Sequence, residues 1–259
     1  MTPSSLRLAV AGGSAWSDPQ DALIWAERQL AEAASARADL LVLPQQLFGA
    51  CGEEQALLSD DRSLRALAQA VARHGVATAF GYVEQCTGRR HHAVQLVGAG
   101  GLALANYRAA HLTPDAMAAG LSPGNWLNQA RLGDLAVGLL GDDDLSVPEP
   151  SRALALAGSA VLAIPADISG APAEIVTALL RARAFENCCA VAFANRASAP
   201  PSMIVGPDGS PLAQVPEGLA VAEVPRTRPP EAASRLAARR PLLYQRLSSP
   251  HAQDRAPRD

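Results

Sequence analysis

The stretch LAVGLLGDDDLSVPEPSRALALAGSAVLAIPAD, residues 135–167, contains the pattern that decides the fold. An apolar run ends in three consecutive aspartates at residues 142–144. Pro148 and Glu149 then open a helical pattern, because helices favour proline at their first position and acidic residues in their first turn. A second apolar run follows at residues 159–167. The pattern predicts a strand–helix–strand unit of a layered α/β fold. Its aspartates stand at a strand-to-helix turn, where many α/β enzymes hold a nucleophile.

The composition limits the classes of function. A chain of 259 residues with 49% apolar residues suits one large globular domain. A net charge of −3 gives no reason to expect nucleic acid or membrane as partner. No apolar run is long enough to span a bilayer, and the first residues lack a basic-then-apolar leader pattern, so we expect a cytoplasmic protein. All 22 basic residues are arginine, so no step that needs a lysine can use this chain.

Strand and helix patterns alternate along the rest of the chain. We expect strands at 6–13, 39–49, 76–84, 91–101, 102–112, 159–167 and 189–196, a strand pair within 130–141, and a last hairpin of 202–215 and 218–224 around a Pro-Asp-Gly turn. We expect helices at 18–38, 60–75, 149–158 and 171–188, with Gly75 ending the second, and a loop at 113–126. Residues 1–247 are predicted to form a single domain, and 248–259 a disordered tail.

Seven stretches, in order, resemble the carbon–nitrogen hydrolase (nitrilase) superfamily, from about Leu6 to Leu247. They are ADLLVLPQQLFGACG (38–52), FGYVE (80–84), NYRAAHL (106–112), LLGDDDLSVPEPSRALALAGS (139–159), RARAFENCCAVAFAN (181–195), SMIVGPDGSPLA (202–213) and LAARRPLLY (236–244). The resemblance implies an α/β fold, a four-layer αββα sandwich, which commonly forms a homodimer. It implies no cofactor.

The resemblance also identifies the catalytic positions. In that family a cysteine attacks an amide or nitrile carbon, a glutamate transfers protons, and a lysine stabilises the developing negative charge. Here the glutamate position is Gln45, the lysine position is Ala109 and the cysteine position is Asp142. Gln45 has no proton to transfer, Ala109 has no charge, and a carboxylate is a poor nucleophile toward an amide. Hydrolysis by the family mechanism is therefore not expected.

Two hypotheses follow. In the first, the chain is a pseudoenzyme that binds a small molecule or takes part in assembly, as a homodimer or with a related, active subunit. In the second, it is an enzyme with altered chemistry on an amide, nitrile or carbamoyl compound. Asp142 would then act as a base, its pKa raised by Asp143 and Asp144, or Cys51 would be a relocated nucleophile. The three aspartates could alternatively bind Mg²⁺, although we expect no metal, because consecutive residues rarely converge on one ion.

Two further residues belong to the candidate pocket. Glu84 matches a second family glutamate and would orient a substrate. Arg108 precedes the lysine position, but neighbouring residues of a strand point to opposite faces, so it is not expected to replace the missing cation. His91 and His92 are expected to be solvated or hydrogen-bonded rather than ligands.

Overall fold

The computed structural model describes residues 5–13, 16, 18–49 and 56–248. The chain divides into two units, Met1–Pro229 and Pro230–Asp259. The described part of the smaller unit consists of α6 (Glu231–Ala237) and a stretch of 3₁₀-helix (Pro241–Ser248). The predicted domain end at residue 247 stays a prediction, and the predicted tail lies almost wholly outside the described residues.

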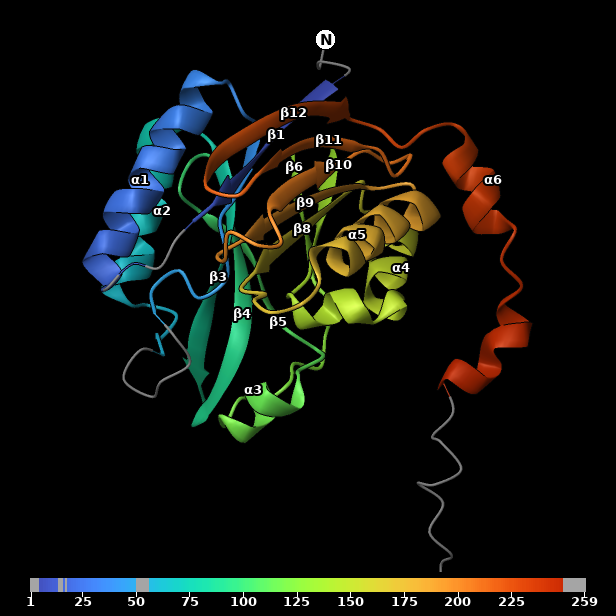
Figure 1. Cartoon of the computed structure of the whole chain (residues 1–259), viewed down its shortest axis with the longest axis horizontal. Coiled ribbons are helices and arrows are strands. Elements are labelled where there is room, and N and C mark those ends of the chain that lie inside the picture. The colour runs from blue at the N-terminus through green and yellow to red at the C-terminus, as the bar shows by residue number, and fades with distance from the viewer. Residues whose placement is uncertain (1–4, 14–15, 17, 50–55, 249–259) are drawn as a thin grey trace, which may run out of the picture. The chain divides into compact units, whose positions relative to one another are not determined.

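The larger unit contains two mixed sheets (Figure 1). Within the described residues, the first sheet has the order β12-β1-β2-β3-β4-β5, in which β2 runs parallel to β1 and β3 and the other pairs are antiparallel. Its strands are β1 (Ser5–Gly12), β2 (Leu40–Val42), β3 (Ala77–Cys86), β4 (Arg89–Val97), β5 (Ala103–Arg108) and β12 (Gly218–Pro225).

The second sheet has the order β11-β10-β9-β8-β7-β6, with β7, β8 and β9 parallel. Its strands are β6 (Gln129–Leu132), β7 (Leu135–Leu139), β8 (Val161–Ala166), β9 (Ala190–Asn195), β10 (Ser202–Val205) and β11 (Pro211–Val215). The strand–helix–strand unit predicted from residues 135–167 is thus β7, α4 (Pro148–Leu156) and β8.

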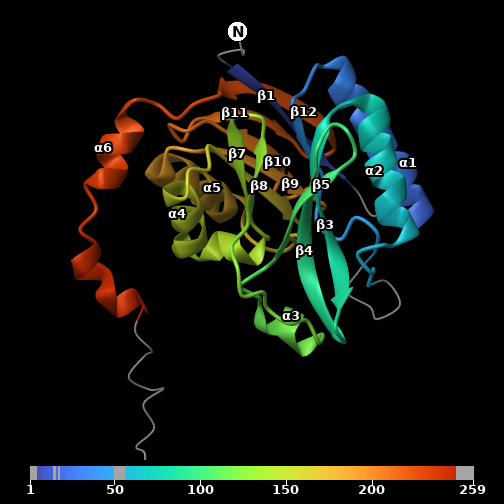
Figure 2. The same cartoon turned by 180° about the vertical axis from the view of Figure 1, so that it is seen from behind.

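Helices cover the outer face of each sheet, as Figures 1 and 2 show from opposite sides. α1 (Pro19–Ser35) and α2 (Arg62–His74) pack on the first sheet, and α4 and α5 (Ala173–Asn187) on the second. The Asp18 side chain accepts hydrogen bonds from backbone N–H groups at the start of α1, and Gly75 ends α2, as predicted, with a φ of 69°. The predicted four-layer αββα sandwich is confirmed.

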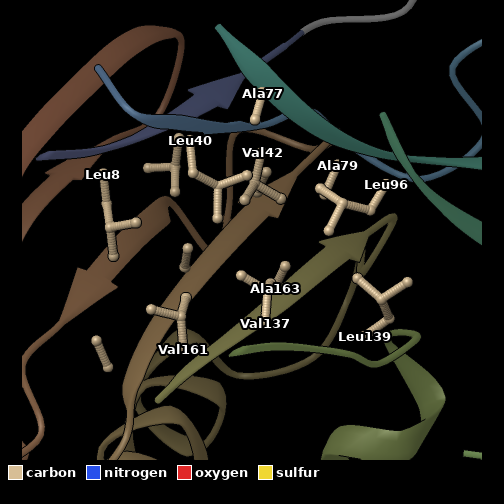
Figure 3. Packing of buried hydrophobic residues seen from close by; sticks show 14 of the residues in the cluster. Leu8, Leu40, Val42, Ala77, Ala79, Leu96, Val137, Leu139, Val161 and Ala163 are labelled. Atoms are coloured by element: carbon tan, nitrogen blue, oxygen red, sulfur yellow. The ribbon is translucent and has the colours of Figure 1, made fainter. Parts of the chain in front are cut away.

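The central core lies between the two sheets (Figure 3). Alternate residues of each strand point into it, so Val161 and Ala163 of β8 face the first sheet, whereas Leu162 faces the helices. The side chains labelled in Figure 3 include Leu8, Leu40, Val42, Ala77, Ala79 and Leu96 from one sheet and Val137, Leu139, Val161 and Ala163 from the other. The sandwich therefore holds the carboxyl ends of β7 and β8 in fixed positions, where the aspartates of the turn emerge.

Three local features differ from the sequence predictions. The last predicted hairpin is wrong in part, because β12 leaves β11 and pairs antiparallel with β1 in the other sheet. A short helix, α3 (Pro114–Ala118), begins within the predicted loop, capped by the Thr113 side chain. The three aspartates open a 3₁₀-helix (Asp143–Ser146) before α4. Among the described residues, no helix combines the length and the apolar character needed to cross a membrane.

Candidate functional site

Asp142 follows β7 and is 8% exposed. Backbone N–H groups hold both of its carboxylate oxygens: that of Asp143 donates to Oδ1 at 3.0 Å, and that of Asp167, after β8, donates to Oδ2 at 3.0 Å. The carboxylate therefore has a fixed orientation at the ends of two adjacent parallel strands, which is where open α/β sheets place their ligands.

Asp144 has a structural role on the opposite side of the turn. Its Oδ2 accepts from the Tyr107 hydroxyl at 2.7 Å and from the Gly141 N–H at 2.9 Å. Its Oδ1 accepts the backbone N–H of His111 at 3.1 Å and lies 2.9 Å from the Nδ1 atom of the same residue. Burial, with the charge of Asp144, raises the pKa of Tyr107 above its usual value, so the hydroxyl stays a donor. Asp144 ties β5 to the turn and does not point at the cavity described below.

Asp143 points toward His92 on β4. The backbone N–H of Thr113 donates to Asp143 Oδ2 at 3.0 Å. Burial, and then the charge of Asp142, raises the pKa of Asp143 to about 6, although the Thr113 N–H and His92 act in the opposite direction. The aspartate run thus contains one carboxyl, that of Asp143, with a raised pKa.

His92 lies on the face of β4 that points between the sheets and is 7% exposed. Among the described residues, His92, Asp142 and Asp143 form the group that could hold a metal ion, and their ligand atoms lie within 4.8 Å of one another. Asp144, the third member of the predicted aspartate trio, does not belong to this group, so the predicted Mg²⁺ arrangement is not formed as such.

A cavity of about 600 Å³ opens beside Asp142. Its lining combines aspartates and His92 with apolar side chains of α5. The lining residues are Gln46, His92, Thr113, Asp115, Ala116, Ala119, Asp142, Asp143, Leu145, Ser146, Asp167, Ile168, Ser169, Ala171, Ile175, Val176 and Leu179. Burial raises the pKa of Asp167. An ion pair with Arg196, with 3.3 Å between Nη1 and Oδ2, partly offsets this rise. The described lining contains no arginine.

Gln45 is fully buried at the end of β2. Its Nε2 donates to the Tyr82 carbonyl at 3.4 Å, and its Oε1 accepts no hydrogen bond from the described residues. The side chain lies over Gly81, where a Cβ atom would be only 1.6 Å from Oε1. Gln45 is absent from the cavity lining, whereas Gln46 belongs to it.

Ala109 is buried next to the aspartate turn. Its N–H donates to the His92 carbonyl at 2.8 Å, and a Cβ atom at Gly141 would lie 3.0 Å from its own Cβ. Ala109 and Gly141, far apart in sequence, thus lie next to each other. Because Ala109 carries only a methyl group, position 109 supplies no cation to the site.

Arg108 and Glu84 form an ion pair on the outer face of the first sheet, with 2.5 Å between Nε and Oε2. Asn106 also donates to Glu84 at 3.2 Å. Neither Glu84 nor Arg108 lines the Asp142 cavity; Arg108 and His91 line a separate, polar pocket of about 590 Å³. Arg108 and Ala109 thus lie on opposite faces of the first sheet. Cys51 lies outside the described residues.

Sequence reasoning missed His92 and Asp167 as site residues. The signal for His92 was present, because it alternates with the inward-facing Val94 and is therefore on the same face of β4. Asp167 ends the second strand of the opening stretch, so the parallel pairing of β7 with β8 was enough to place it beside Asp142.

Comparison with known proteins agrees with this geometry. The model of the carbon–nitrogen hydrolase family matches residues 7–229. A Pseudomonas protegens protein named "Hydrolase in pqqF 5'region" is 36% identical over 236 residues, covering 82% of this chain and 81% of that protein. An (R)-stereoselective amidase from Pseudomonas sp. is 33% identical over 177 residues, 66% of this chain and 64% of that protein.

Solved structures of an amidase of the nitrilase superfamily from Nesterenkonia sp. AN1 also match. A double mutant of that amidase, in complex with acrylamide, has a TM-score of 0.84 at 26% identity and covers 95% of this chain and 98% of that one. A cysteine-to-alanine mutant in complex with butyramide has a TM-score of 0.83 at 27% identity and covers 93% of this chain and 96% of that one.

Proposed function

Because this chain belongs to the carbon–nitrogen hydrolase family, we propose that it is a pseudoenzyme that binds a small molecule in the Asp142 cavity. The observation that carries this proposal is the chemistry of position 142: a buried carboxylate stands there, and backbone N–H groups of Asp143 and Asp167 hold both of its oxygens. Its relatives are named as a hydrolase and amidases.

The replacements remove each part of the family reaction. A thiolate can form an acyl intermediate with an amide, whereas attack by Asp142 would give a high-energy anhydride. The amide of Gln45 cannot accept and return a proton at neutral pH. Ala109 offers no charge to a developing oxyanion, and no lysine exists elsewhere in the chain to supply one.

The cavity supports binding over a purely structural role. A protein kept only for assembly has no need for open space at this point, and the small Ala109 and the neutral Gln45 would tolerate larger apolar neighbours. Instead, about 600 Å³ remains open, lined by both polar and apolar groups. Volumes and linings of this kind are typical of small-molecule sites.

A second candidate function is altered chemistry at the same place. It is favoured by the pKa of Asp143, about 6, which suits a group that exchanges protons near neutral pH, and by the nearby His92. In this version Asp143, rather than the predicted Asp142, would be the base acting on water or on a substrate proton.

Turnover of a panel of amides, nitriles and carbamoyl compounds tests both candidates. The wild type is compared with Asp142→Asn, Asp143→Asn and Cys51→Ser, and ammonia and acid products are measured. We expect no product from any variant. Product that disappears in Asp143→Asn or Asp142→Asn would establish a carboxylate-based enzyme, and product that disappears only in Cys51→Ser would establish a relocated nucleophile.

A further inference from the structure

We infer that the ligand of the Asp142 cavity is an organic cation, a primary ammonium compound with a short apolar chain. The inference rests on the proposed binding function and names its ligand class. Three properties of the cavity support it: its charge, the closeness of three acceptors, and its apolar lining residues.

The charge of the lining is strongly negative. Asp115, Asp142, Asp143 and Asp167 all contribute to it, and no arginine does so among the described lining residues. Only Asp167 of these four forms an ion pair, with Arg196 at 3.3 Å, in the part of the chain that the structure describes. A carboxylate or phosphate ligand would meet repulsion here, and a neutral amide would gain nothing from the charge. A cation would be attracted, more strongly than in bulk water because the site is partly buried.

The acceptors lie close enough together for one ammonium group to reach all of them. The three N–H bonds of an R–NH₃⁺ group point to tetrahedral directions, so acceptors at hydrogen-bond distance lie about 4.6 Å apart. The acceptor atoms of His92, Asp142 and Asp143 lie within 4.8 Å of one another.

Part of the cavity lining is apolar. Ile175, Val176 and Leu179 of α5 belong to it, together with Leu145 and Ile168. An alkyl chain that extends from the ammonium group would bury its surface here, at about 0.8 kcal/mol per methylene. The combination of acidic and apolar lining residues therefore favours an amine with a short chain over a bare inorganic cation.

Calorimetric titration with three matched probes tests the inference on the intact protein. The probes are n-butylammonium, the neutral butyramide and the anionic butyrate, which share the same chain. We expect n-butylammonium to bind at least tenfold more tightly than either of the others and to weaken as salt is raised from low to physiological concentration. Equal affinity for the three, preference for butyrate, or no binding of n-butylammonium would overturn the inference.

Charge variants locate the site. Asp143→Asn should lower the affinity for n-butylammonium about tenfold, whereas Glu217→Gln, which removes an exposed charge from the turn between β11 and β12, should leave it unchanged. Equal losses in both variants would mean that net charge, rather than the cavity, attracts the probe. Parallel titrations with MgCl₂ and ZnCl₂ form a separate arm: tight metal binding lost in Asp143→Asn, without n-butylammonium binding, would replace the inferred site by a metal site.

These outcomes are separable from those of the proposed function. Catalytic turnover of the amide panel would refute the pseudoenzyme and leave the preference for a cation standing. Absence of turnover together with preference for butyrate or butyramide would refute the cation and leave the pseudoenzyme standing.

Discussion

Three adjacent aspartates have three different environments. Asp142 is held by two backbone N–H groups, Asp143 lies beside His92 with a raised pKa, and Asp144 is saturated by hydrogen bonds from β5 and its flanks. The 3₁₀-helix separates their directions, because successive residues of such a helix point about 120° apart. Three identical neighbouring residues therefore have different roles: Asp144 holds the turn in place, whereas Asp142 and Asp143 line the cavity.

The first prediction concerns the structural role of Asp144. In Asp144→Asn, at least one of the surrounding donors would face an amide N–H₂ group instead of an oxygen, and the charge-assisted hydrogen bonds would be lost. We expect a loss of roughly 2 kcal/mol or more in the free energy of unfolding, measured by urea denaturation at pH 7. Asp143→Asn is the matched control, since its charged form is disfavoured by burial. An equal loss in both variants would contradict this division of roles.

The second prediction concerns pH. Asp143 should titrate near pH 6, which carboxyl ¹³C NMR measures. Because this pKa is above that of the unfolded chain, the stability that this carboxyl contributes is complete below about pH 4 and is lost as the pH rises through 6. Asp142→Asn should lower the midpoint without restoring the ordinary value, since burial is the larger cause. A wild-type midpoint near 3.8 would contradict the assigned environment.

At the scale of elements, Gly81 on β3 makes room for Gln45 at the end of β2. A Cβ atom at position 81 would lie 1.6 Å from Gln45 Oε1 and 2.7 Å from its Cα. Rotation of the Gln45 side chain can relieve the clash with Oε1 but not the clash with Cα. The backbones at positions 45 and 81 must therefore move apart as well.

The third prediction follows from this close approach. Gly81→Ala should destabilise the protein by about 1–3 kcal/mol, and adding Gln45→Ala should recover only part of the loss, because the clash with Cα remains. Thermal and urea unfolding measure both variants. Gly100→Ala, at a turn glycine whose Cβ would meet open space, is the control and should have little effect. Full recovery in the double variant would show that the strand backbones are not the constraint.

Element types were more predictable than element partners. The opening stretch predicted β7, α4 and β8 because apolar runs, Pro148 and the aspartate turn are local signals. The pairing of β12 with β1 joins residues more than 200 positions apart, and no local pattern distinguishes this pairing from a hairpin with β11. The meeting of Ala109 with the aspartate turn came from the family resemblance, whereas the place of His92 needed the register of β4.

At the scale of the larger unit, the two sheets share one apolar core (Figure 3). The fourth prediction is that Leu40→Ala, in that core, costs about 2–5 kcal/mol in the free energy of unfolding. Leu102→Ala, at a side chain that is 70% exposed, should cost little. Urea denaturation compares them, and similar costs would contradict the position of the core.

Assembly remains a prediction of the resemblance. We expect a homodimer, or a complex with a related subunit, and sedimentation equilibrium of the full chain measures which forms. A monomer at all accessible concentrations would contradict the homodimer and would leave the cavity, which a single chain forms, unaffected.

The central claim is that this chain keeps the cavity of its family without the family reaction. Ammonia release from butyramide and butyronitrile by the wild-type protein, followed over many hours beside the Asp142→Asn variant, tests it most directly. The account predicts that neither protein releases ammonia above the rate in buffer. Release by the wild type that Asp142→Asn abolishes would contradict it and would make the buried carboxylate a catalyst.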